Sequence, residues 1–197
     1  MKLGSTLIVD TFAEAFRMRY VRLLITAVDE YWLDAALREF TGYGSSVIGC
    51  DAEVGVEQLL AEEQTPDGRP GAAVLAFGFS ADALANAVPN RVGQCLMTCP
   101  TTAVYNGLPD ADESIPLGKH LRYFGDGHQK SKVINDRRYW RVPVMDGEFV
   151  VEETIGVAKG VAGGNIILQG CACKAALTAA RRGIEALAPL SGVEAVF

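Results

Sequence analysis

Residues Ala72-Ala-Val-Leu-Ala-Phe-Gly-Phe79 decide the fold class of this chain. The run is almost wholly apolar and follows a dense turn stretch at residues 65–71, which predicts a buried strand. Ser80 comes next and is a typical helix N-cap, and Leu84, Ala85 and Val88 follow at helical spacing. The segment therefore predicts a strand that passes directly into a helix, with the helix ending near Pro89.

The same pattern stands earlier in the chain. Residues 20–27 form an apolar run that suits a sheet, and Asp29 stands where an N-cap is expected. Trp32 and Phe40 follow among apolar residues at helical spacing, which is typical of core side chains, and Gly42 is a plausible stop. A second strand–helix unit is therefore expected here.

The rest of the chain predicts shorter elements. The expected strands lie at residues 46–48, 94–98, 119–125, 138–144, 148–153, 166–168 and 193–197, and a last helix at 172–187. Asp146-Gly147 predicts a hairpin turn, because this pair tolerates the positive φ that such a turn needs. The order of elements predicts an α+β fold, a ferredoxin-like lobe of split βαβ units with a β-rich subdomain inserted at about residues 105–161.

Composition excludes several classes of protein. The 197 residues are 49% hydrophobic and 21% charged with a formal net charge of −6, which argues against disorder and against general nucleic-acid binding. A membrane-spanning helix needs about 20 mostly apolar residues, and no run in this sequence provides them. The N-terminus does not have the pattern of a secretory signal. The five cysteines have neither zinc-ribbon spacing nor a secretory context. We expect a cytoplasmic protein without a metal.

Glycine is enriched, with 21 residues, above the usual ~7%. Five stretches are more polar than a core demands: residues 10–16, 63–71, 91–95, 123–129 and 160–165, and the last four contain eight of the glycines. The stretch at 160–165 is no dinucleotide fingerprint, since a strand rather than a helix is expected after it. Two interpretations stay open: ordinary tight turns, or backbone shaped to approach a flat or bulky ligand.

These stretches supply the candidate ligand-binding residues. Asp67 and Arg69 either pair with each other or reach a carboxylate or phosphate. Asp126 either closes an Asx-type turn or faces a ligand, and Glu14 either favours a helix start or orients an amine. The full set of candidates is Glu14, Asp67, Arg69, Arg91, Gln94, Phe124, Asp126, Glu148, Gly163, Gly164 and Asn165. Gln94 and Asn165 carry neutral amides, each able both to donate and to accept hydrogen bonds.

Six motifs carry a specific resemblance when they are taken in order. They are Asp10-Thr-Phe-Ala-Glu-Ala-Phe16, Thr65-Pro-Asp-Gly-Arg-Pro-Gly71, Gly93-Gln-Cys95, Phe124-Gly-Asp-Gly127, Gly147-Glu-Phe149 and Gly160-Val-Ala-Gly-Gly-Asn165. Over nearly the whole chain these resemble formylmethanofuran:tetrahydromethanopterin formyltransferases. The stretch around Arg138-Tyr-Trp-Arg141 resembles the version found in C1-oxidising bacteria, a subunit of a formyltransferase/hydrolase complex.

The resemblance implies a reaction and its partners. A formyl group would move between the amine of a methanofuran-type or methylofuran-like carrier and N5 of tetrahydromethanopterin, both acting as cosubstrates. No metal and no covalently bound cofactor is implied. The chain also has four local clusters of basic residues, which would otherwise be solvated surface charge and would then bind the anionic tails of the carriers. They are Arg17, Arg19 and Arg22; Lys130 and Lys132; Arg137, Arg138 and Arg141; and Arg181 and Arg182. A homo-oligomer or a formyltransferase/hydrolase complex is expected, with no nucleic acid and no membrane.

The resemblance also implies a division into lobes. Residues 1–197 correspond to the N-terminal lobe, and family members carry a second, similarly folded lobe with a glutamate regarded as catalytic, so the catalytic residues of this chain stay unknown. Two functional hypotheses remain open. The chain is either a formyltransferase, or a shortened paralogue or fragment that acts as a binding or assembly module with full-length formyltransferase or hydrolase subunits.

Overall fold

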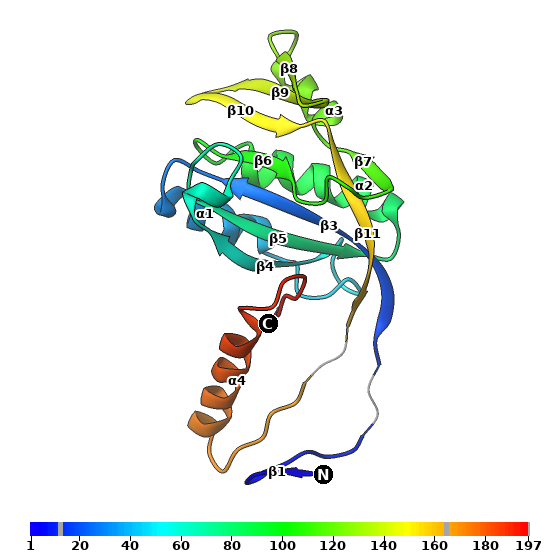
Figure 1. Ribbon diagram of the computed structural model, residues 1–197, viewed down its shortest axis with the longest axis vertical. Helices are drawn as coiled ribbons and strands as arrows, with labels where there is room; N and C mark the ends of the chain where they lie inside the picture. Colours follow the sequence, from blue (N-terminus) through cyan, green and yellow to red (C-terminus); the bar gives the residue numbers. More distant parts are fainter. Residues whose placement is uncertain (12–13, 164–165, 197) are drawn as a thin grey trace.

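The computed structural model describes residues 1–11, 14–163 and 166–196. The main body of the protein is one mixed β-sheet with helices packed against it (Figure 1). Within the described residues the sheet has nine strands: β3 (Phe16–Thr26), β4 (Glu53–Leu60), β5 (Gly71–Gly78), β6 (Ala103–Asn106), β7 (Glu113–Pro116), β8 (Lys130–Ile134), β9 (Arg137–Val144), β10 (Gly147–Glu152) and β11 (Thr154–Ala162). The α-helices are α1 (Glu30–Thr41), α2 (Ala81–Arg91), α3 (Gly118–Leu121) and α4 (Cys173–Leu187).

The centre of the sheet is a ferredoxin-like unit. Helix α1 connects β3 to β4, and α2 stands between β5 and β6. The four strands lie in the order β4-β5-β3-β6, and every neighbouring pair is antiparallel. This is the strand order of a split βαβ unit. The predicted α+β class and ferredoxin-like architecture are therefore confirmed.

The side of the sheet that faces α1 and α2 is the main core. Val21, Leu23 and Ile25 alternate along β3 and are fully buried, in one cluster with Phe40 of α1 and Leu84 of α2. Strand side chains alternate between faces, so these residues point toward the helices and their neighbours point away. Removal of this apolar surface from water is the main force that holds the helices on the sheet.

The helix starts follow the predicted caps. The Asp29 carboxylate accepts from the Trp32 amide at 3.0 Å and the Ser80 hydroxyl accepts from the Ala83 amide at 3.1 Å, so each satisfies a backbone donor that the first helical turn leaves unpaired. The predicted stop near Pro89 is wrong. The Pro89 ring is buried within α2, which continues to Arg91 and passes into a π-helix, η2 (Val92–Leu96), where a short strand was expected.

The inserted subdomain extends the sheet on one side. Strand β10 pairs in parallel with β6, and β9 and β8 follow outward as antiparallel neighbours. The predicted hairpin at Asp146-Gly147 joins β9 to β10, with Gly147 at a φ of 145°. The expected strand at 119–125 is wrong: α3 and a 3-10 turn, η3 (Arg122–Gly125), occupy it, because Leu117 and Leu121 are buried at i, i+4 spacing.

Three other predicted strands are not formed by the described residues. Residues 46–48 form a turn, and the strand lies later, at β4. Residues 166–168 and 193–196 have no regular structure and pair with no strand among the described residues, whereas residue 197 lies outside them. The short hairpin β1 (Lys2–Leu3) and β2 (Thr6–Leu7) and helix α4 lie apart from the sheet in Figure 1. In the part of the chain that is described, no helix combines the length and apolar character needed to cross a bilayer.

Candidate functional site

The sheet surface opposite α1 and α2, here called the open face, carries aromatic and ionisable side chains. Its members on neighbouring strands are Tyr20, Arg22 and Thr26 of β3, Phe77 of β5, Tyr105 of β6, Tyr139 of β9 and Glu152 of β10. The rings of Tyr20 and Phe77 stack with centroids 5.3 Å apart, and those of Tyr105 and Tyr139 are 6.1 Å apart. Phe77 and Tyr105 are buried, so the half-buried rings of Tyr20 and Tyr139 are the ones that a flat ligand could contact.

The densest hydrogen bonding on the open face surrounds Asp67. Its Oδ2 atom accepts from the Thr26 hydroxyl at 2.8 Å, from Arg69 Nε at 2.8 Å and from the Tyr105 hydroxyl at 2.9 Å. Its Oδ1 atom accepts only one long bond, from the Arg69 amide at 3.4 Å, among the described residues. These four residues are here called the Asp67 cluster. In it, the hydrogen-bonding capacity of Oδ2 is used by three donors, whereas Oδ1 can accept a further donor.

The cluster also fixes its own protonation. Burial alone would raise the pKa of Asp67, but the hydrogen bonds from Arg69, Thr26 and Tyr105 outweigh burial and hold it below its ordinary value. Burial and the neighbouring Asp67 charge raise the pKa of Tyr105. At neutral pH the cluster is therefore an ionised carboxylate faced by a protonated phenol.

The loop that carries Asp67 and Arg69 is tightly folded. The Thr65 hydroxyl accepts from the Arg69 amide at 3.1 Å and donates to the Arg69 carbonyl at 2.8 Å, which closes the predicted turn stretch. At Gly71 an added Cβ would lie 2.7 Å from Thr65 Cγ2 and 2.9 Å from the Ile25 carbonyl oxygen. Glycine is needed there because the loop returns against β3 without room for a side chain.

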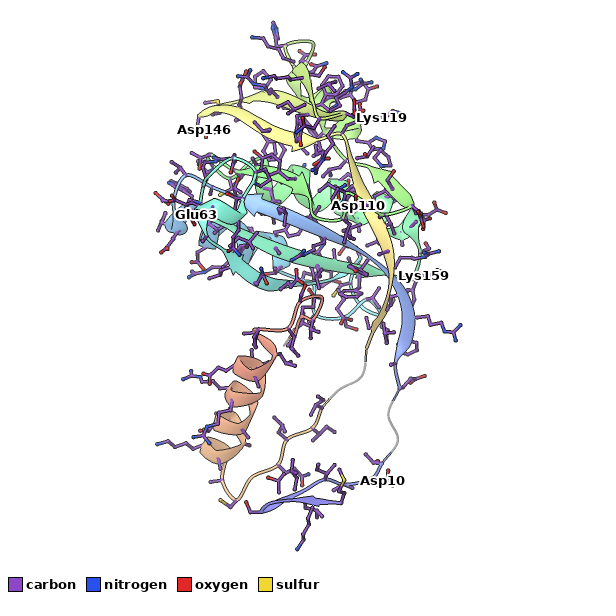
Figure 2. The ribbon with its side chains drawn as sticks, in the orientation of Figure 1. Asp10, Glu63, Asp110, Lys119, Asp146 and Lys159 are labelled. Atoms are coloured by element: carbon purple, nitrogen blue, oxygen red, sulfur yellow. The ribbon has the colours of Figure 1, made fainter. Side chains whose placement is uncertain are left out.

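Arg69 reaches beyond its own loop. Its Nη2 donates to the Thr26 hydroxyl at 3.0 Å, and its Nη1 donates to the Thr101 carbonyl at the entrance to β6. In Figure 2 Glu63, in the loop before β5, and Asp146, at the β9–β10 hairpin, lie on the same side of the molecule, away from Asp110, Lys119 and Lys159. The Asp67 cluster therefore lies at the end of the sheet where this loop and hairpin converge.

Two predicted motifs meet at the other end of β3. Ala162 of β11 pairs with Phe16 of β3, and a Cβ added at Gly163 would lie 2.8 Å from the Phe16 ring. Glu14 is exposed just before β3, so it and Gly163 flank the same end of the ladder. Residues 12 and 13 of the first motif lie outside the described residues, as do the candidates Gly164 and Asn165.

Other candidates lie on the helix side of the sheet. Gly93 in η2 packs close to α3 and η3, since a Cβ there would lie 3.7 Å from Phe124 Cε2. Gln94 is exposed beside it. Asp126 has a left-handed φ of 46°, in the loop that also contains Phe124. The structure thus brings Gln94 and the Phe124 loop near one another, on a different surface from the Asp67 cluster.

Two charged candidates are paired within the protein. The Arg91 side chain is only 8% exposed, and it donates to Asp51 and to the carbonyls of Phe40, Gly42 and Tyr43. Its guanidinium therefore anchors the chain after α1. Glu148 of β10 pairs with Arg141 of β9 across the hairpin.

A second polar group lies at the inserted subdomain. Arg137 binds the buried Glu152 in bidentate fashion, with both nitrogen–oxygen distances 2.6 Å, and Glu152 accepts from the Asn106 amide at 2.9 Å. A hollow of about 380 Å³ opens beside this pair. The pair satisfies its own charges, so it favours a structural link between β6, β9 and β10.

The residues that sequence reasoning missed are those that complete the Asp67 cluster. Thr26 ends an apolar strand, Tyr105 lies in a short strand and Thr101 follows a proline. Tyr105 and Thr101 carry no local signal, because each reaches Asp67 or Arg69 only through tertiary folding. A polar residue at the end of an otherwise apolar strand was the one available hint, at Thr26.

Comparison with known families now places the chain. The family model described as formylmethanofuran-tetrahydromethanopterin formyltransferase matches residues 1–144, and the model of its proximal lobe matches residues 147–197. The chain belongs to the formylmethanofuran-tetrahydromethanopterin formyltransferase family. The resemblance read from the six motifs is thereby confirmed.

Particular relatives bear the family's name. A formylmethanofuran–tetrahydromethanopterin formyltransferase of Rhodopirellula baltica is 47% identical over 100% of this chain and 63% of its own length, and one of Methanosarcina mazei is 44% identical over 100% and 66%. Among solved structures, the formyltransferase/hydrolase complex (FhcABCD) of Methylorubrum extorquens with methylofuran includes a chain that matches with a TM-score of 0.90 and 41% identity. That match covers 95% of this chain and 63% of the other. This chain therefore spans about two thirds of the length of these relatives.

Proposed function

We propose that this protein takes part in formyl transfer between a formylmethanofuran or methylofuran-like carrier and N5 of tetrahydromethanopterin. The observation that carries the proposal is the match, at 47% identity and along the whole chain, to a relative named for this activity. The structure with methylofuran supports a furan-type carrier as one cosubstrate. Direction of flux does not enter the proposal, because the same arrangement serves either direction.

The chemistry needs little covalent help from the protein. The acceptor amine nitrogen attacks the formyl carbon, its electron pair forms the new C–N bond, and the carbonyl oxygen becomes a tetrahedral oxyanion. The oxyanion then reforms the carbonyl as the bond to the donor nitrogen breaks. The attacking amine loses one proton and the leaving amine gains one. Holding both amines against one carbonyl supplies most of the acceleration.

Within this reaction we assign Asp67 and Arg69 to carrier binding. The Asp67 Oδ1 atom has only one long hydrogen bond within the described residues and belongs to an ionised carboxylate, so it can accept an N–H from a carrier. The Tyr105 ring is buried, and the half-buried Tyr139 ring beside it offers apolar surface to a flat ring. The guanidinium of Arg69 holds the carboxylate in place.

The other sequence candidates stay predictions for further contacts with the carriers. Glu14 and Gly163, with Gly164 and Asn165, would serve a ligand at the end of the β3–β11 ladder. Gln94, Phe124 and Asp126 would serve one on the helix side, and Glu148 one at the β9–β10 hairpin. For Arg91 only an indirect role is left, through the loop that it anchors.

A formyl-transfer assay on the purified chain tests the proposal. Asp67→Asn keeps the shape but removes the charge, and is expected to lower kcat/KM at least roughly tenfold, the scale of one lost charge-assisted hydrogen bond. Glu63→Gln, an exposed change in the same loop, is the matched control and should stay within about twofold. Calorimetry with each carrier accompanies the assay, and no heat with either carrier would contradict an intact site.

A second candidate function is assembly with other subunits. Helix α4 has no buried residue, and Leu177 on its apolar stripe is 72% exposed. Exposed apolar stripes of this kind mark interfaces. We propose that this stripe packs against another copy, a hydrolase-type subunit or a second lobe, with residues 1–197 as the N-terminal lobe and residues 105–161 as its insertion. A cytoplasmic location remains the prediction made from sequence.

Light scattering over a concentration series tests the assembly role. The wild-type chain should associate as its concentration rises, and Leu177→Ser should weaken that association because it removes an apolar contact. Lys174→Ser, also on α4, controls for the helix itself. A monomer at every concentration, which also fails to bind full-length formyltransferase or hydrolase subunits, would contradict the assembly role.

A further inference from the structure

Thr101 holds a backbone conformation that its side chain disfavours. Its φ is 67°, in the left-handed region, where a β-branched residue crowds its own backbone. This conformation is unfavourable for threonine and persists only where surrounding contacts impose it. Thr101 immediately follows Pro100, just before β6, and sequence reasoning gave it no role.

Three parts of the chain that are distant in sequence hold Thr101. The Val28 amide, after β3, donates to the Thr101 hydroxyl at 3.1 Å. The Thr101 amide donates to Asp146 Oδ2, at the β9–β10 hairpin, at 2.6 Å. The Thr101 carbonyl accepts from Arg69 Nη1. The hydroxyl, the amide and the carbonyl of one strained residue are therefore each bound by a different segment.

These contacts form a continuous path to the ligand-binding carboxylate. Asp146 binds the Thr101 amide, the Thr101 carbonyl binds Arg69, and Arg69 binds Asp67 through Nε at 2.8 Å. Arg69 is about one third exposed, so without the carbonyl its long side chain has other rotamers available. The orientation of the Asp67 carboxylate thus depends on a hairpin that does not touch it.

We infer that Thr101, pinned by Asp146, is a positioning residue that sets the Arg69 guanidinium and through it the Asp67 carboxylate for carrier binding. The inference rests on the proposed carrier-binding role of Asp67. It makes the β9–β10 hairpin of the inserted subdomain part of the binding apparatus without any contact between the hairpin and the carrier. Backbone strain at Thr101 is the sign of this function, since nothing in local sequence requires it.

The test begins with Asp146→Ala in the full chain. Loss of the acceptor lets Thr101 relax to negative φ and withdraw its carbonyl from Arg69. Carboxyl-carbon NMR should then show Asp67 titrating at higher pH than in the wild type. The KM of the carrier should rise roughly tenfold with kcat within about twofold, as expected for loss of one hydrogen bond to a charged group in binding rather than in the reaction. Asp112→Ala, an exposed change in the turn before β7, is the control and should change neither readout.

A double variant separates positioning from general damage. Glycine adopts the left-handed conformation without crowding, so Thr101→Gly combined with Asp146→Ala should return both the Asp67 titration and the KM toward wild-type values. A merely damaged fold would not be repaired by removing a side chain. Thr101→Val removes only the hydroxyl bonded to Val28 and should shift both readouts in the same direction as Asp146→Ala. It carries the test where Asp146→Ala is too unstable to fold.

The inference and the proposed function fail in different ways. An unchanged Asp67 titration in Asp146→Ala and Thr101→Val would overturn the positioning role, whatever the activity. The opposite outcome is a chain that neither binds a carrier nor transfers formyl groups, although its Asp67 titration shifts in Asp146→Ala and is restored by Thr101→Gly. That outcome would contradict the proposed function but would still support the positioning of Asp67 by Thr101.

Discussion

The Tyr105 hydroxyl donates to Asp67 Oδ2 at 2.9 Å, and this bond joins β6 to a loop 38 residues earlier in the chain. Each partner sets the state of the other. Burial and the charge of Asp67 raise the pKa of the phenol, and the hydrogen bond from the phenol helps to lower the pKa of Asp67. The bond is therefore both a support of the loop and a determinant of its charge.

Tyr105→Phe should weaken this support without altering packing. We expect a loss of about 1–2 kcal/mol in the free energy of unfolding at pH 7, because a half-buried carboxylate loses one donor. The pKa of Asp67 is lowered in the fold, so its stabilisation is present above the ordinary value of 3.8 and is lost as pH falls below it. Urea unfolding from pH 7 to pH 3 should therefore show a smaller acid loss in Tyr105→Phe than in the wild type. Tyr139→Phe is the control, and an equal effect of both changes would contradict the assignment.

Gly71→Ala should destabilise the loop that carries Asp67. The new Cβ would meet Thr65 Cγ2 at 2.7 Å and the Ile25 carbonyl at 2.9 Å, so the loop or strand must move. A cost of about 1–3 kcal/mol is expected, as for overpacking of a core. Gly183→Ala in α4 is the matched control. Among the described residues no atom outside its own helix backbone lies within 4 Å of the new Cβ, and alanine should favour the helix by up to about 1 kcal/mol. Thermal unfolding of both variants measures the contrast, and a neutral Gly71→Ala would refute it.

Arg91→Ala should lower the free energy of unfolding and should not remove a direct contact with a ligand. The change leaves three backbone carbonyls after α1 unpaired and removes the partner of Asp51, at a cost of roughly 3–5 kcal/mol. The guanidinium also lowers the pKa of Asp51 against the effect of burial, so Asp51 should titrate nearer its ordinary value in the variant. Arg38→Ala, whose ion pair with Asp34 is solvent-exposed, should change stability by less than about 1 kcal/mol. Carrier affinity that falls in a fully stable Arg91→Ala protein would show a direct binding role instead.

Glu194→Gln should change how the C-terminal segment responds to pH. The Glu194 carboxyl lies over Gly55 of β4, and burial together with the charge of Glu53 raises its pKa to about 9. Because the pKa is raised, docking of the segment is fully favoured below the ordinary value of 4.5 and weakens as pH rises through 9. The nearby Gly192 amide, which donates to Glu57, reports docking by its hydrogen-exchange protection. Protection corrected for intrinsic exchange should fall from pH 5 to pH 9 in the wild type and in Glu185→Gln on α4, but not in Glu194→Gln. A parallel decline in all three proteins would argue against the carboxyl as the cause.

Sequence reasoning predicted the parts of the fold whose own residues carry the signal. Strand β5 is apolar along its length, and Asp29 and Ser80 cap their helices through their own side chains. Strand β4 was missed because Glu53 and Glu57 interrupt its apolar pattern, and the charge of Glu57 is paired with Arg22 of another strand. Strand β8 was missed because all of its residues are exposed and it has no buried face to alternate with.

Predictions for the site succeeded where the signal was local and failed where it depended on tertiary structure. Asp67 and Arg69 were found because aspartate, glycine and proline around them indicate a turn, and the turn is stabilised locally by Thr65. Tyr105 and Thr101 were not found, because their roles exist only after β6 is placed beside β3. Pairing between Asp67 and Arg69, one of the two open interpretations, is present, and it coexists with a carboxylate oxygen that remains available.

The absence of a side chain at Gly160 of β11 constrains how sequences of this family can vary. A Cβ at this position would lie 2.9 Å from both the Phe77 and the Tyr20 rings, so the absence of a side chain matches the size of the stacked pair. The three positions are far apart in sequence but behave as a single packing unit. Substitutions among them should therefore be correlated across related proteins: a larger residue at position 160 is compatible only with smaller ones at 20 or 77, and a change at one position alone should be rare.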